Sequence, residues 1–63
     1  MTPQEFRAIR IDLGLTQQDL AVVMGYSSAG RVSIVENADT VPTQVGKLME
    51  AYRSGYRPDN WPG

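Results

Sequence analysis

Apolar residues recur at a helical spacing in four stretches of the chain, and this pattern predicts four short helices. The first apolar stripe consists of Phe6, Ile9 and Leu13. The other three stripes consist of Leu20, Ala21 and Met24, of Val32 and Val35, and of Val45, Leu48, Met49 and Tyr52. Each stripe can be buried against the others, so we expect an all-α fold of four helices.

The first and fourth helices are predicted to begin at prolines. Thr2 can cap the first helix with Pro3 in its first position, and the helix continues to about Leu13. Pro42 starts the fourth helix, which ends near Arg53. Residues 56–63 contain two prolines and are expected to form an irregular tail after a domain of residues 1–55.

A glycine-centred turn is predicted between the second and third helices. Thr16 can cap the second helix, and Asp19 can reach back to the capping amide, as in a capping box. Gly25 follows the last apolar residue, where helices commonly end in a left-handed conformation that glycine adopts without steric penalty. Tyr26, Ser27 and Ser28 follow and supply the turn and a second cap. Two helices joined by a tight turn result.

A glycine inside the fourth helix and two adjacent valines in the second helix bear on how these helices pack. Gly46 lies inside the fourth helix, where glycine costs about 1 kcal/mol relative to alanine, and this favours close approach of another helix. Val22 and Val23 make the second helix apolar on more than one face. We expect one valine to join the core and the other to be exposed; a partner-binding patch is the alternative.

Composition narrows the functions open to a chain of this size. Its 63 residues bound it to one small domain with a few kcal/mol of net stability. Cysteine and histidine are absent, which excludes disulfides, thiolate or imidazole metal sites and Ser-His catalysis. We therefore expect no enzyme, no metal or other cofactor and no small-molecule ligand. Without a signal-peptide segment or an apolar run of roughly 20 residues, we expect a cytoplasmic protein without membrane contact.

A dozen residues of the central region occur in a fixed order: an arginine, Leu-Gly-Leu, a polar cap and Gln, Leu-Ala, a turn Gly, a Val-Ser pair and a Glu. They are Arg10, Leu13, Gly14, Leu15, Thr16, Gln17, Leu20, Ala21, Gly25, Val32, Ser33 and Glu36. This order resembles the helix-turn-helix of the Cro and phage-repressor (XRE-like) family, and the likeness runs from about Phe6 to about Tyr52. It implies a four-helix, lambda-repressor-like DNA-binding domain whose second motif helix enters the major groove.

The resemblance also implies a function. A member of this family would be a sequence-specific, double-stranded DNA-binding transcriptional regulator, which represses and autoregulates a small phage or mobile-element operon by binding an inverted repeat. The sequence leaves open whether that operon encodes a phage switch, a toxin–antitoxin pair or an anti-CRISPR gene. The alternative is an antitoxin-like protein-interaction module in which partner binding is primary. The formal charge of −1 favours this alternative slightly and predicts weak non-specific DNA affinity.

One group of residues is expected to contact DNA, and a second group is expected to hold the DNA-contacting helices in place. The resemblance implies that Arg10 and Glu36 form a structural ion pair, with an ordinary exposed arginine as the alternative. DNA contacts are expected from Gln17, Gln18, Ser27, Ser28, Ala29, Arg31, Ser33, Ile34, Asn37 and Thr43. Gly25 and Glu36 are separated by one residue more than the commonest family spacing, which either lengthens the turn or shifts the start of the second motif helix.

Arg31 is the only cation in the proposed recognition segment. Arginine can donate two hydrogen bonds to guanine, so we expect this residue to make the strongest base contact. A phosphate contact, or an ion pair with Asp39, is the alternative. Gln17 can donate to a phosphate at the start of its helix, with a solvated side chain as the alternative.

Aromatic residues near the C-terminus are candidates for a homodimer interface. They are Tyr52, Tyr56 and Trp61. A dimer is expected because one short helix reads only a few base pairs, and symmetric half-sites double that information. Packing of these aromatics back on the first helix is the alternative.

Overall fold

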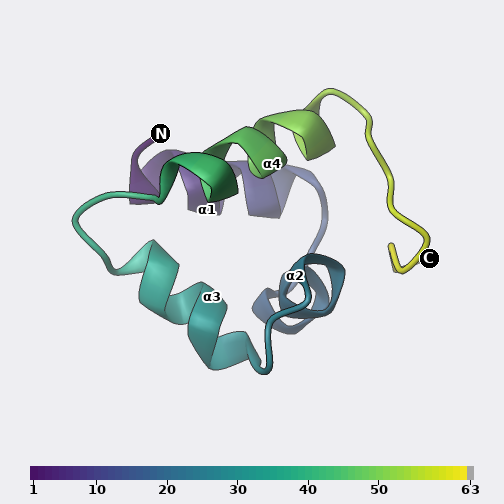
Figure 1. Cartoon of the computed structure of the whole chain (residues 1–63), viewed down its shortest axis with the longest axis horizontal. Coiled ribbons are helices and arrows are strands. Elements are labelled where there is room, and N and C mark those ends of the chain that lie inside the picture. The colour runs from purple at the N-terminus through teal and green to yellow at the C-terminus, as the bar shows by residue number, and fades with distance from the viewer. Residues whose placement is uncertain (63) are drawn as a thin grey trace.

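Four α-helices make up the computed structural model, which describes residues 1–62. They are α1 (Pro3–Asp12), α2 (Gln17–Met24), α3 (Ala29–Glu36) and α4 (Thr43–Arg53), and these residues form no strand. In Figure 1, α1 and α4 lie together on one side of the molecule, with α2 and α3 on the other. The all-α fold and the four helices predicted from the apolar stripes are confirmed. No helix in the described range has the length and apolar character needed to cross a membrane.

Side-chain caps fix where α1 and α2 begin. The hydroxyl of Thr2 accepts from the Glu5 amide at 3.1 Å, and the Glu5 carboxylate accepts from the Thr2 amide at 2.9 Å. The hydrogen bond from the Thr2 backbone lowers the pKa of Glu5, and the bond to the Thr2 side chain adds to the effect. Thr16 and Asp19 make the same reciprocal pair before α2, with both bonds at 3.0 Å. The predicted Thr2 cap and Thr16 capping box are therefore confirmed.

The turn after α2 is built around a left-handed glycine. Gly25 has φ +75°, and its N–H donates to the Val22 carbonyl at 3.1 Å. The N–H of Tyr26 donates to the Ala21 carbonyl at 2.8 Å, which completes a Schellman motif. Ser28 holds the N-cap position of α3, but its side chain makes no capping hydrogen bond. The second cap therefore lies within the predicted stretch, without a hydrogen bond from its side chain.

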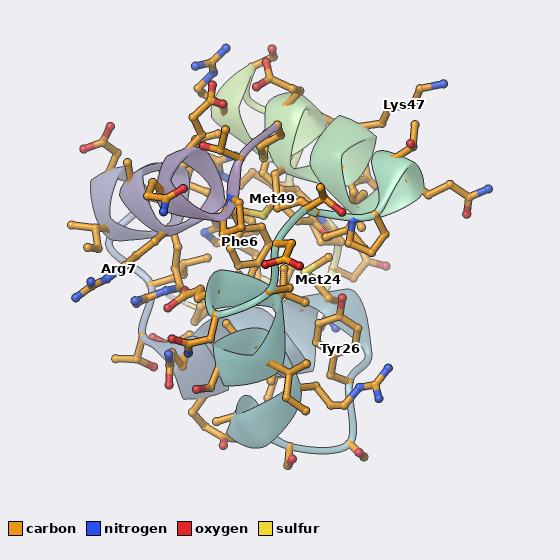
Figure 2. All side chains as sticks on the ribbon, turned by 90° about the vertical axis from the view of Figure 1, so that its left-hand side faces the viewer. Phe6, Arg7, Met24, Tyr26, Lys47 and Met49 are labelled. Atoms are coloured by element: carbon orange, nitrogen blue, oxygen red, sulfur yellow. The ribbon has the colours of Figure 1, made fainter. Side chains whose placement is uncertain are left out.

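The core lies where the four helices meet. Its buried residues are Phe6, Ile9, Leu15, Leu20, Ala21, Val23, Val32, Val41, Met49 and Tyr52. Figure 2 shows Phe6 of α1 and Met49 of α4 in the middle of the molecule, and both are fully buried. Val23 is buried whereas Val22 is 49% exposed, as expected when one of these two valines joins the core.

Gly46 does not mark a close approach between helices. The residue is buried in α4, but the atom nearest to an added Cβ would be Met1 Cβ, at 3.5 Å. That distance is an ordinary van der Waals contact, and Met1 precedes α1. The sequence-based interpretation of Gly46 is therefore wrong, because the chain end rather than a helix covers this position.

The residues after α4 pack back on the helices. Asn60 donates its side-chain amide to the Val22 carbonyl at 2.9 Å, and Trp61 meets the Tyr52 ring edge-on with centroids 5.3 Å apart. The guanidinium of Arg57 lies 4.2 Å from the centroid of the Trp61 ring and donates to the Tyr52 carbonyl at 2.7 Å. Figure 1 shows this segment running from the end of α4 towards α2. The tail is irregular, as predicted, and it closes one side of the core.

Candidate nucleic-acid interface

One side of α3 is packed into the molecule and the other side is exposed. Val32 is fully buried and Val35 is half-buried, and these residues hold the helix against the core. Arg31 and Asn37 are exposed, and 62% of the Ile34 surface is accessible. Figure 1 shows α3 at the edge of the molecule. The described fold therefore leaves a helix face open to a partner.

The ten residues predicted to contact DNA all retain some accessible surface. Seven are exposed: Gln18, Ser27, Ser28, Arg31, Ile34, Asn37 and Thr43. Three are half-buried: Gln17, Ala29 and Ser33. The turn occupies residues 25–28 and α3 begins at Ala29, which shows where the helix after the turn starts.

Thr43 is not grouped with the other residues predicted to contact DNA. It begins α4 and lines a cavity of about 520 Å³ together with Met1, Glu5 and Gly46, and no residue of α3 lines this cavity. Most of the other predicted contacts lie on α3 or in the turn before it, so the structure groups them and does not group Thr43 with them.

A buried polar network supports α3 from behind. Arg10 Nε donates to Glu36 Oε2 at 2.6 Å, and the side chains of the two residues are only 11% and 6% exposed. Arg10 Nη1 also donates to the Leu15 carbonyl at 2.9 Å. The predicted ion pair is confirmed, and it connects the end of α1 with the end of α3.

Gln17 belongs to the same network, which sequence reasoning missed. Its Nε2 donates to Glu36 Oε1 at 3.0 Å, so one N–H of the side-chain amide is directed into the protein. The amide nitrogen carries a second N–H, and the phosphate contact predicted for Gln17 remains a prediction for that group. No spacing rule signals this bond, because the two residues come together only through the packing of α2 on α3.

Polar groups on the exposed face of α3 are partly engaged with one another. Asn37 Nδ2 donates to the Ser33 carbonyl at 2.8 Å and to the Ser33 hydroxyl at 3.4 Å. The Arg31 guanidinium lies 5.9 Å from the centroid of the Tyr26 ring. Within residues 1–62 the two ion pairs use Arg10 and Arg53, so the structure does not contain the alternative pair of Arg31 with Asp39.

Tyr52 is not available for the predicted dimer interface. It is 2% exposed because α4 turns it into the core, so the prediction for this residue is wrong. Burial raises the pKa of its phenol, and the neighbouring Tyr56 and Tyr26 add to the shift. Trp61 is half-buried against Tyr52, and Tyr56 stacks on the same ring with centroids 6.1 Å apart. Only Tyr56, at 56% exposure, keeps a large accessible aromatic surface among the three.

The described residues offer little for other kinds of site. Within residues 1–62, no three acidic side chains gather in a group that could hold a metal ion. A second cavity, of about 510 Å³, lies between the α2–α3 turn and α4, with Met24, Tyr26, Val45 and Leu48 in its lining. Its walls are mainly apolar side chains, which suit a packing partner better than a charged ligand.

Comparison of the chain with protein-family models, with curated protein sequences and with solved structures gave no match. The described residues define an all-α protein of four short helices. Its outstanding surface feature is the helix that follows the Gly25 turn, with one face buried and the other open.

Proposed function

We propose that the protein is a sequence-specific, double-stranded DNA-binding transcriptional regulator that reads bases with the exposed face of α3. The observation that carries this proposal is the face itself, where Arg31 and Ile34 are exposed on a helix held by Val32, with the half-buried Ser33 farther round the helix. The major groove of B-DNA, about 12 Å wide, admits a helix of this kind. Arginine suits guanine, isoleucine suits the methyl group of thymine, and serine bonds to either bases or phosphates.

The network around Glu36 supports the same proposal. A helix that discriminates bases has to be held firmly, since an error of about 1 Å in position removes directional hydrogen bonds. Arg10 holds the end of α3 to α1, and Gln17 holds it to the first turn of α2. The N-terminus of α2 also favours an anion, so a phosphate there would receive the second N–H of Gln17.

Charge sets the expected strength of binding. Four of the six cationic side chains have partners within the chain: Arg10 with Glu36, Arg53 with Glu50, and Arg57 and Arg31 with the rings of Trp61 and Tyr26. Phosphate contacts therefore contribute little, and non-specific affinity should be weak. We propose that two chains bind an inverted repeat as a homodimer, with Tyr56 as the exposed aromatic candidate for the interface. Repression and autoregulation of a small operon are the parts of the proposal that the family resemblance alone supports.

Selection from random duplexes at low and moderate salt tests this function. The expected result is a recovered inverted repeat that competes with random DNA in a gel shift, with two chains per site by light scattering. A wild-type chain that enriches no sequence at either salt concentration contradicts the proposal. A single non-repeated site bound by a monomer removes the dimer and keeps the DNA reader.

An antitoxin-like interaction module is the alternative. The apolar cavity between Tyr26 and Leu48 favours it, since such a surface suits a protein partner. The tail that would serve as the partner-binding segment is engaged with the chain's own helices through Arg57, Asn60 and Trp61. DNA reading is therefore the better supported function.

A further inference from the structure

Tyr26 has a fixed place between α2 and α3. Its N–H is bound to the Ala21 carbonyl, in the Schellman motif that Gly25 makes possible. Its side chain is half-buried and packs against the core. Figure 2 shows the side chain of Tyr26 beside α3 and below Met24. The ring therefore lies half-buried in the turn that leads into α3.

Arg31 lies near that ring. Its guanidinium carbon lies 5.9 Å from the centroid of the Tyr26 ring, within the roughly 6 Å at which a cation and an aromatic ring attract each other. Within residues 1–62 the ion pairs belong to Arg10 and Arg53, so the ring of Tyr26 is the partner that the structure records for this guanidinium.

Contact with a ring leaves the hydrogen-bonding groups of arginine usable. The five N–H donors of a guanidinium lie in its plane, whereas the ring attracts the cation as a whole. Guanine offers O6 and N7 in the major groove, and two in-plane N–H groups match them. A side chain held near its bound position also loses less rotamer freedom when DNA arrives.

We propose that Tyr26 is a positioning residue that sets the base preference of Arg31 without touching DNA itself. This inference rests on the DNA-reading function proposed above. It adds a residue of the turn to the determinants of sequence specificity, through the direction in which it holds the arginine.

The test compares Tyr26→Leu with the matched control Tyr26→Phe, which keeps the ring. The quantity measured is discrimination between the selected operator and the same operator changed at the base pair that depends on Arg31. Tyr26→Leu should lower this discrimination about two- to fivefold, the range expected of an exposed cation–ring contact, and Tyr26→Phe should leave it unchanged. On an Arg31→Ala background, Tyr26→Leu should cause no further loss of discrimination.

A measurement without DNA checks that the contact exists. In the free protein, the side-chain δ protons of Arg31 should have ring-current-shifted NMR signals in the wild type and in Tyr26→Phe. They should return to ordinary positions in Tyr26→Leu. Thermal unfolding of each variant confirms that all are folded at the temperature of measurement.

Three results would overturn the positioning role. They are wild-type Arg31 signals without a ring-current shift, unchanged discrimination in Tyr26→Leu, and an equal loss on the Arg31→Ala background, which would make Tyr26 merely structural. A wild-type chain that selects no DNA sequence overturns both this inference and the proposed function. A selected operator with unchanged discrimination in Tyr26→Leu overturns only the inference.

Discussion

Arg31 is the residue on which the proposed base reading depends most. In the proposed complex, Arg31 donates two hydrogen bonds to one guanine in each half-site, so replacing it with alanine should cost about 1–3 kcal/mol per half-site. The preference at one symmetric base-pair position should relax, while other positions keep theirs. Binding to a set of operators changed one position at a time measures this effect.

Arg7→Ala is the matched control for Arg31→Ala. Arg7 is an exposed arginine of α1, and Figure 2 shows it pointing away from the molecule, so its loss changes the net charge equally without altering α3. If Arg31 contacts a phosphate instead, every sequence loses affinity alike and the salt dependence becomes shallower. An undiminished preference at all positions in Arg31→Ala would exclude a base contact.

Arg10 has a structural role that a stability measurement can separate from DNA binding. Arg10→Ala leaves the Glu36 carboxylate buried without its cation and should lower the free energy of unfolding by about 3 kcal/mol. Arg53→Ala is the control, since its pair with Glu50 is exposed and should contribute less than about 1 kcal/mol. Urea unfolding followed by circular dichroism compares the variants. An unchanged midpoint with weakened operator binding would show that Arg10 contacts DNA instead.

At the scale of single elements, the backbone preference of each residue contributes to stability, and Gly46 in α4 is an example. Gly46→Ala should raise the free energy of unfolding by roughly 0.5–1 kcal/mol, because alanine favours a helix and the new methyl group only reaches ordinary contact with Met1. Gly25→Ala is the opposite control: φ there is +75°, and the substitution should cost about 1 kcal/mol or more. Denaturant midpoints give both values. A loss of stability in Gly46→Ala would mean that this site is packed more tightly than the 3.5 Å spacing indicates.

At the scale of the whole molecule, the tail is part of the fold. The rings of Trp61 and Tyr52 pack edge to face, and the Arg57 guanidinium lies over the Trp61 ring. Trp61→Ala should therefore lower the free energy of unfolding by about 1–2 kcal/mol, from lost apolar burial and the lost aromatic pair. Trp61→Phe keeps an aromatic ring and should recover part of this loss. An unfolding midpoint unaffected by Trp61→Ala would show that the tail is not held in solution.

The buried phenol of Tyr52 should make the free energy of unfolding of the whole molecule fall at alkaline pH. Burial raises its pKa in the folded chain above the ordinary value of 10.0, so the unfolded chain ionises first as the pH rises. Its stabilising contribution is therefore complete below the unfolded pKa and is lost as the pH rises through the folded one. Tyr52→Phe should reduce this alkaline loss while leaving neutral stability similar. Denaturant unfolding of the wild type and of Tyr52→Phe across the alkaline pH range measures the difference. An equal fall of the free energy of unfolding with pH in the two proteins would contradict the role of Tyr52.

Local interactions explain why much of the architecture could be predicted from sequence. The Thr16–Asp19 capping box and the turn at Gly25 depend on residues within a few positions of each other, and both occur as predicted. Apolar spacing likewise determined the four helices, because it fixes which face of each helix avoids water. The pair of Arg10 with Glu36 is a contact over a long sequence distance, and the family resemblance was needed to predict it.

Only the tertiary structure decided how the helices and the tail turn towards one another. It turned Tyr52 inwards, set Met1 against Gly46 and brought the Gln17 amide to Glu36. It also laid Trp61 on the core and Arg31 over the Tyr26 ring. Each of these contacts depends on helix orientation or chain direction, which follows from the packing of the whole core. Local residue order determined the elements of this protein, and three-dimensional packing determined which side chains remain available to a partner.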